Sequence, residues 1–155
     1  MIKILIVEDE TIVALDTKST LIKLGYEVTD IVTSYEEALL SFSKNKPDII
    51  LMDIFLKNSL SGIDIAKKVN ENSNTAIIFM SAYCDDETLD KAAKIEPFAY
   101  LVKPFNRNDL KSSMNIATYK LQKRSEKIDE NGKSNAFSLQ YIYNYHIFCP
   151  FFIFI

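Results

Sequence analysis

Polar side chains follow four apolar runs of the sequence, each at the point where the run ends. In chain order they are Glu8, Asp9, Asp53, Ser81 and Lys103. Carboxylates held close together repel one another, so their pKa values rise unless a cation joins them. Mg2+ suits such a group best, because it accepts a few carboxylates and keeps several of its waters. The three carboxylates therefore predict a magnesium site, provided that the fold brings them together.

The other two polar residues supply groups that could stabilise a phosphoryl group as it is transferred to a carboxylate. Lys103 supplies a fixed positive charge, and Ser81 supplies a hydroxyl that can donate to an oxyanion. A metal and a lysine would absorb charge in the transition state of phosphoryl transfer. With these groups around it, the carboxylate of Asp53 is the expected nucleophile.

The apolar runs themselves are typical of strands buried on both faces of a parallel sheet, where apolar and polar residues need not alternate. Strands are predicted at 2–7, 26–32, 49–52, 76–80 and 98–102, and a helical pattern follows each of them. This alternation predicts an α/β fold, a doubly wound (βα)5 parallel sheet. For it we expect the flavodoxin-like strand order 2-1-3-4-5. The third strand then lies between the first and the fourth, so the polar side chains converge on one rim of the sheet.

The spacing of apolar residues predicts which face of each helix packs on the sheet. The predicted inward residues of the first helix are Ile12, Leu15, Ile22 and Leu24. Those of the fourth helix are Leu89, Ala92 and Ala93. Ser34 and Glu37 predict a capping box at the start of the second helix, and Asn106 is the expected cap of the fifth.

The composition argues against several classes of protein. A chain of 155 residues suits one compact domain. A net charge of −3 and a pI near 5.2 argue against direct binding of nucleic acid, which usually needs a basic patch. Cys84 and Cys149 are too few for a disulfide framework or a zinc site, and the first residues lack a signal-peptide pattern. We therefore expect a cytoplasmic location.

Five motifs, in order, match one known family. They are ILIVEDE at 4–10, PDIILMDI at 47–54, SGIDIA at 61–66, FMSAY at 79–83 and FAYLVKPF at 98–105. Over residues 1–124 the sequence resembles the receiver domain of two-component response regulators, the CheY-like superfamily, in its single-domain form. Each motif alone would be weak evidence, but all five at the family's spacing are highly specific.

The resemblance implies a role for each residue around Asp53. Asp53 would accept a phosphoryl group from a phosphohistidine on a partner sensor histidine kinase. Asp9 and Asp53 would bind Mg2+ directly, together with the backbone carbonyl of Phe55, and Glu8 would hold the ion through water. Lys103 would pair with the phosphoryl group, and its bond to Pro104 would be cis.

The resemblance also implies a conformational switch. Ser81 occupies the hydroxyl switch position and Tyr100 the aromatic one. Phosphorylation would draw in the Ser81 hydroxyl and then the Tyr100 ring, and would change the face built from the fourth helix, fifth strand and fifth helix. That face would bind a downstream protein effector or a second copy of the chain.

Bulky Phe55 and Tyr83, at positions that tune self-dephosphorylation, suggest a long-lived phosphoryl group. The chain would assist its own phosphorylation and dephosphorylation without being an enzyme.

Three other kinds of protein fit the sequence less well. A degenerate receiver, acting as a phosphorylation-independent interaction module, would be expected to have lost an acidic or lysine position, and here all of these positions are present. A haloacid-dehalogenase-type phosphatase needs a second Asp two residues after its nucleophile, where this sequence has Phe55. A flavodoxin-like FMN carrier needs a neutral, Gly-rich loop after the first strand, where Glu8, Asp9 and Glu10 would repel phosphate.

The end of the sequence differs from the rest. Residues 125–155 are expected to be a polar linker followed by an aromatic-rich tail, and not a second domain. Gln140, Asn144, His146 and Pro150 interrupt the tail, so it does not suit a membrane span. Contact with a bilayer interface and a remnant without a selected role both stay open for it.

Overall fold

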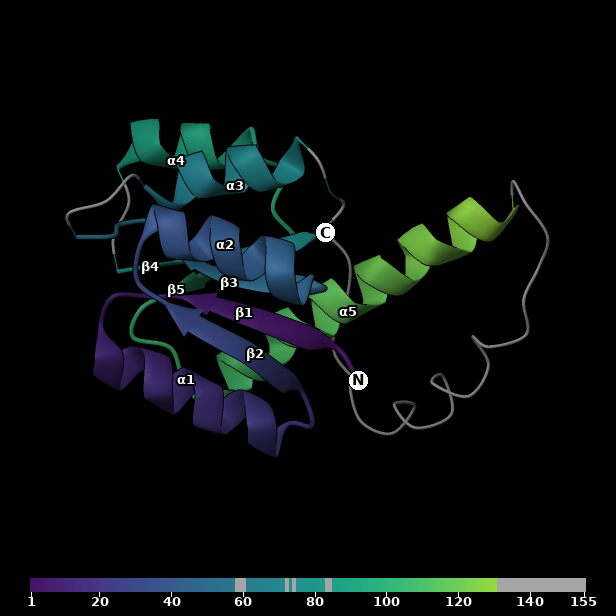
Figure 1. Ribbon diagram of the computed structural model, residues 1–155, viewed down its shortest axis with the longest axis horizontal. Helices are drawn as coiled ribbons and strands as arrows, with labels where there is room; N and C mark the ends of the chain where they lie inside the picture. The colour runs from purple at the N-terminus through teal and green to yellow at the C-terminus, as the bar shows by residue number, and fades with distance from the viewer. Residues whose placement is uncertain (58–60, 72, 74, 83–84, 131–155) are drawn as a thin grey trace, which may run out of the picture. The chain divides into compact units, whose positions relative to one another are not determined.

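The computed structural model describes residues 1–57, 61–71, 73, 75–82 and 85–130 (Figure 1). Five strands alternate with five helices, and the chain divides into two units, Met1–Thr118 and Tyr119–Ile155. The strands are β1 Lys3–Val7, β2 Glu27–Val32, β3 Ile49–Asp53, β4 Ala76–Ser81 and β5 Ala99–Val102. The helices are α1 Thr11–Lys23, α2 Tyr35–Asn45, α3 Gly62–Asn70, α4 Asp86–Ala93 and α5 Arg107–Glu130.

The strands form one parallel sheet in the order β2-β1-β3-β4-β5, which confirms the predicted α/β fold and its topology. In Figure 1, α2, α3 and α4 cover one face of the sheet, and α1 and the first part of α5 cover the other. Residues of β3 and β4 are buried along their whole length. Strands covered on both faces have no wet side, and this accounts for their unbroken apolar sequences.

Successive residues of the central strands supply the two halves of the core. One cluster joins Leu5, Ile50, Met52 and Phe79 to the inward side chains of α2, α3 and α4. Ile4, Ile6, Leu51 and Ile78 alternate with them along the strands and are equally buried. In a strand, neighbouring side chains point to opposite faces, so each short run serves both layers of helices.

The predicted inward face of α1 is wrong. Ile12, Leu15 and Ile22 are 84%, 56% and 54% exposed, whereas the buried residues of the helix are Ala14, Thr17 and Leu21. Apolar residues lie on several sides of α1, so their spacing does not single out one face. The face of α1 that packs on the sheet includes two small side chains, Ala14 and Thr17.

The predicted face of α4 is only partly right. Ala92 is fully buried, but Leu89 is 41% exposed and Ala93 is exposed as well. Ile95, just beyond the helix, packs on the core in their place. A helix of eight residues has little more than two turns. Its inward stripe therefore holds few residues, and the chain that follows the helix completes the packing.

The predicted caps are confirmed, with one change of partner. The Glu37 N–H donates to Ser34 Oγ at 3.3 Å, but the Glu37 carboxylate accepts from Thr33 N–H at 2.9 Å, one residue earlier than in a standard capping box. At α5, Asn106 Oδ1 accepts from the N–H of Asp109, whose carboxylate accepts in return from Asn106 N–H.

Helix α5 continues past residue 124 to Glu130, so the first residues of the predicted linker are helical. Lys123 pairs with Glu126 at 2.7 Å, one turn along the helix, which favours helix in this polar stretch. The division at residue 124 stays a prediction. The aromatic tail, Tyr83 and Cys84 lie outside the described residues. None of the helices in the described part of the chain is long and apolar enough to cross a membrane.

Substitution of Lys46 tests the left-handed backbone conformation at the C-terminal end of α2. This residue caps the helix with φ of 47° and ψ of 63°, a left-handed conformation that costs a side-chain-bearing residue about 1 kcal/mol and costs glycine almost nothing. Lys46→Gly is therefore expected to raise the free energy of unfolding by about 1 kcal/mol in urea denaturation. The matched change Lys44→Gly, inside the last turn of α2, should lower it by a similar amount. Equal losses in both variants would contradict the assignment.

Candidate phosphoacceptor site

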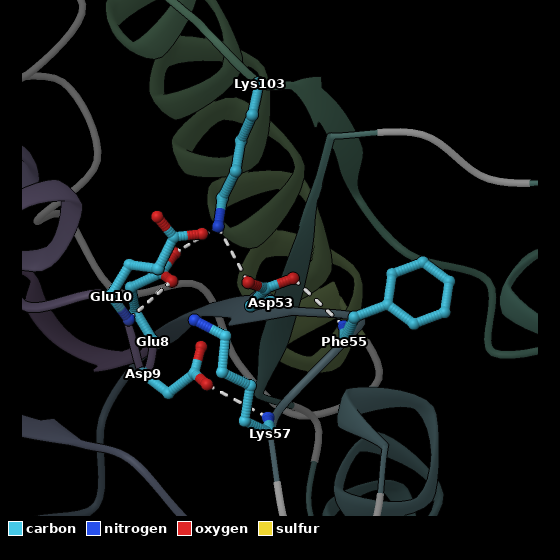
Figure 2. Close-up of polar contacts among 7 residues, drawn as sticks. All are labelled: Glu8, Asp9, Glu10, Asp53, Phe55, Lys57 and Lys103. Carbon is cyan, nitrogen blue, oxygen red and sulfur yellow. Dashed lines mark hydrogen bonds and ion pairs between the residues drawn. The ribbon is translucent and has the colours of Figure 1, made fainter.

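The carboxyl ends of β1, β3 and β5 bring four of the predicted polar side chains into one group (Figure 2). Glu8 and Asp9 directly follow β1, Asp53 is the last residue of β3, and Lys103 directly follows β5. Backbone hydrogen bonds carry the sheet register into this region: Ile54 N–H donates to Met80 O at 3.0 Å, and Lys103 N–H donates to Ser81 O at 2.8 Å. The parallel sheet thus aligns residues that lie far apart in sequence.

Asp53 is buried and held at both of its carboxylate oxygens. Oδ1 accepts from the Phe55 N–H at 3.0 Å, and Oδ2 lies 2.7 Å from Lys103 Nζ. These bonds fix the carboxylate with its oxygens at the edge of an open pocket of about 400 Å3. The pocket is lined in part by Asp9, Glu10, Phe55, Lys57, Ser61 and Lys103.

Lys103 bridges two carboxylates. Its Nζ lies 2.5 Å from Glu8 Oε2 as well as 2.7 Å from Asp53, and the side chain is 10% exposed. Burial alone would lower the pKa of Lys103, but the hydrogen bonds and the charges of Asp53 and Glu8 outweigh it, so the pKa is raised. The lysine therefore stays charged at neutral pH.

Glu8 is the most deeply buried acid of the group, with a fully buried side chain. Burial raises the pKa of Glu8, the bond to Lys103 partly opposes this, and repulsion from Asp53 adds to the rise. Glu8 Oε1 also accepts from the Glu10 N–H at 3.1 Å. A buried acid with a raised pKa, next to a second carboxylate, is where a bound cation would relieve most unfavourable energy.

This raised pKa predicts a pH dependence of stability in metal-free buffer. Between pH 4.5 and the higher pKa of folded Glu8, the folded state keeps a proton that the unfolded state loses, so this acid lowers stability as pH rises. Glu8→Gln should remove that loss. The free energy of unfolding of Glu8→Gln, relative to that of the wild type, is therefore expected to increase as pH rises from about 4.5 to 7.

Urea titrations in EDTA at several pH values measure this difference, in which the contributions of acids remote from Glu8 cancel. Glu27→Gln, which changes an exposed residue of β2, is the control and should follow the wild type. If the wild type instead became more stable relative to Glu8→Gln over the same pH range, the raised pKa of Glu8 would be wrong.

The donor set fits Mg2+. Glu8, Asp9 and Asp53 each offer a carboxylate oxygen, and these oxygens all lie within 4.8 Å of one another. All three donors are hard oxygen ligands, and the pocket is open enough for waters to complete an octahedral shell. The residues present would therefore suit this ion. The predicted roles of the Phe55 carbonyl and of a water between Glu8 and the ion stay predictions.

The predicted switch residues lie on β4 and β5, the two strands that follow β3 in the sheet. Ser81 ends β4 and is 8% exposed, and Tyr100 on β5 is 41% exposed with its ring centroid 5.8 Å from that of Phe79. The Lys103–Pro104 peptide bond is cis, as the resemblance implied. The site residues are therefore where the sequence placed them along the sheet, and their proposed movements stay predictions.

Sequence reasoning missed two residues of the site. Gly62 begins α3 so close to β3 that a Cβ there would lie 1.9 Å from the Asp53 backbone oxygen. Lys57 donates its N–H to Asp9 Oδ2 at 3.0 Å and lines the pocket. A glycine at the first position of a predicted helix, directly after a Ser cap, was a signal for close approach. Lys57 carried no such signal, because it lies in a loop.

The family of the chain follows from comparison with known proteins. A family model described as the response regulator receiver domain matches residues 4–115. The chain belongs to this family. Receiver domains of two-component response regulators take part in phosphorelay signalling, and the chain is a receiver domain of that kind.

Curated relatives of the receiver domain include short and long proteins. Chemotaxis protein CheY of Thermotoga maritima is 32% identical over 114 residues, covering 73% of this chain and 94% of that protein. Transcriptional regulatory protein PdtaR of Mycobacterium tuberculosis is 30% identical over 115 residues, covering 74% of this chain but only 56% of the regulator. Sensory transduction protein LytT of Bacillus anthracis, at 34% identity over 129 residues, is matched over 50% of its length. The chain thus spans about half the length of these two regulators.

Solved structures agree with the receiver fold. The signal receiver domain of a modulated diguanylate cyclase from Desulfovibrio desulfuricans superposes with a TM-score of 0.74 at 34% identity, covering 79% of this chain and 97% of that one. A response regulator from Chloroflexus aurantiacus gives a TM-score of 0.68 at 30% identity, covering 75% of this chain and 97% of that one.

Proposed function

We propose that Asp53 accepts a phosphoryl group from the phosphohistidine of a partner sensor histidine kinase, with Mg2+ bound beside it. The observation that carries this proposal is the carboxylate of Asp53, fixed by Phe55 N–H and Lys103 Nζ at the edge of an open pocket. An asparagine or an alanine there could not form an acyl phosphate. The retained acids and lysine argue against a degenerate receiver.

The transfer uses residues already in place. An oxygen of Asp53 attacks the phosphorus, the new O–P bond forms as the N–P bond of the phosphohistidine breaks, and the electron pair leaves with the imidazole. Lys103, held by Glu8 and Asp53, lies where it can pair with a phosphoryl oxygen. Asp9, Glu8 and Asp53 would hold the metal ion, which neutralises charge on the transferred group.

The output is proposed to be a population shift on the face of α4, β5 and α5. The Ser81 hydroxyl would bond a phosphoryl oxygen, and Tyr100, now part-exposed, would rotate towards the space beside it. Exposed Leu89, Val102 and Ile116 supply apolar area for a downstream protein or a second copy of the chain. Direct contact with nucleic acid is not proposed. A cytoplasmic location stays a prediction.

The chain is proposed to assist its own phosphorylation and dephosphorylation and not to turn over a separate substrate. Intact-mass spectrometry after incubation with acetyl phosphate tests the acceptor directly, with Mg2+ and with EDTA. We expect a gain of one phosphoryl group with Mg2+ and none with EDTA. Folded protein that gains nothing in Mg2+ would favour the alternative, a phosphorylation-independent interaction module.

A further inference from the structure

Lys57 is a second lysine at the phosphoacceptor pocket. Its backbone is tied to the site, because the Lys57 N–H donates to Asp9 Oδ2 at 3.0 Å. The side chain is exposed and lines the pocket with Asp9, Asp53 and Lys103. Figure 2 shows it extending from the loop back towards the carboxylates.

The two lysines of the pocket are held differently. Lys103 is 10% exposed and bridges Glu8 and Asp53, so its removal would leave buried charges without a partner. Lys57 has an exposed side chain, and none of the ion pairs within 4 Å in the described part of the chain includes it. Its ammonium can therefore act on the site only through its electric field, and truncation would not disrupt packing.

The formal charges around the pocket indicate how the charge of Lys57 would affect binding of a cation. Four carboxylates, those of Glu8, Asp9, Glu10 and Asp53, stand against the ammonium groups of Lys57 and Lys103. With all of them ionised, the net charge is −2, which one divalent cation neutralises. Without Lys57 the pocket would carry −3, and it would stay negative after the cation is bound.

We propose that Lys57 sets the charge of the phosphoacceptor pocket, weakening Mg2+ binding to the unphosphorylated site while favouring entry of a dianionic phosphodonor into the metal-loaded site. The proposal rests on the proposed function. A positive charge on the loop repels the incoming divalent ion and attracts the incoming phosphate, so the two effects have opposite signs. Lys57 thus adjusts metal affinity and donor entry, and Lys103 remains the residue that pairs with the transferred group.

Lys57→Met tests the proposal, since methionine keeps an unbranched side chain and loses the charge. Calorimetric titration of the full chain with Mg2+ is expected to show binding about threefold to tenfold tighter than in the wild type. At saturating Mg2+, the initial rate of phosphorylation by acetyl phosphate, read by intact mass, should fall by about the same factor. Both differences should shrink as ionic strength rises, because the lysine is exposed.

Two further variants separate charge from structure. Lys57→Arg keeps the charge and should restore wild-type Mg2+ affinity and rate. Lys23→Met removes the same charge at the far end of α1, whose 13 residues span roughly 20 Å, beyond the screening length of physiological salt. It should match the wild type in both measurements.

The outcomes separate this proposal from the proposed function. Tighter Mg2+ binding with slower phosphorylation in Lys57→Met supports it, because loss of a structural role would weaken both. Binding and rate within twofold of the wild type, or both weakened together, would overturn it while leaving the acceptor role of Asp53 intact. Wild-type protein that neither binds Mg2+ nor gains a phosphoryl group would overturn both.

Discussion

Asp53→Asn is expected to abolish the Mg2+-dependent gain of one phosphoryl group from acetyl phosphate. The amide has nearly the shape of the carboxylate, but its oxygen is a far weaker nucleophile and its nitrogen cannot form an acyl phosphate. Mg2+ affinity should also fall, by about tenfold or more, because one of the three clustered carboxylates is lost. Intact-mass spectrometry and calorimetric titration measure the two effects separately.

Asp48→Asn is the matched control for this variant. Asp48 lies just before the amino end of β3, where its carboxylate accepts from Lys3 N–H at 2.8 Å, and an asparagine oxygen can accept the same bond. The same substitution at that end, roughly 16 Å from Asp53, should leave phosphorylation unchanged. A phosphoryl group that persists in Asp53→Asn would move the acceptor to another residue. Equal loss in Asp48→Asn would show that the effect is not specific to Asp53.

Gly62→Ala is expected to damage both the fold and the site. A Cβ at Gly62 would lie 1.9 Å from the Asp53 backbone oxygen and 2.8 Å from Met52 Cγ, so α3 or the end of β3 must move. Forcing a methyl group into a packed contact of this kind costs about 3 kcal/mol. Because Asp53 itself is displaced, the initial rate of phosphorylation should fall by about tenfold or more even in protein that remains folded.

Gly25→Ala is the control for Gly62→Ala, because it tests the cost of a positive φ without the steric clash expected at Gly62. Gly25 has φ of +90°, but a Cβ there meets nothing within 4 Å, so the change should cost only about 1 kcal/mol and leave phosphorylation unaffected. Urea denaturation gives the two losses of stability, and intact mass gives the two rates. If Gly62→Ala were no more costly than Gly25→Ala, the close approach of α3 to β3 would be wrong.

The sequence by itself determined the sheet and the order of its polar residues. Unbroken apolar runs such as 49–52 and 76–80 are typical of strands buried on both faces, and their alternation with helices leaves few topologies. Once the strand order follows, the positions of Glu8, Asp53 and Lys103 follow with it, because each stands at the carboxyl end of its strand. Local hydrogen bonding likewise made the caps at Ser34 and Asn106 predictable.

Only the tertiary structure decided which side of α1 is buried, how closely α3 approaches β3, and that Lys57 reaches the pocket. Ile12 and Leu15 are apolar but exposed, while the smaller Ala14 and Thr17 are buried. Apolar residues on several sides of one helix leave its orientation open, and the fit of small side chains against the sheet then selects the buried side. Loop residues such as Lys57 have no periodicity at all, so their positions depend on contacts with distant parts of the chain, here the carboxylate of Asp9.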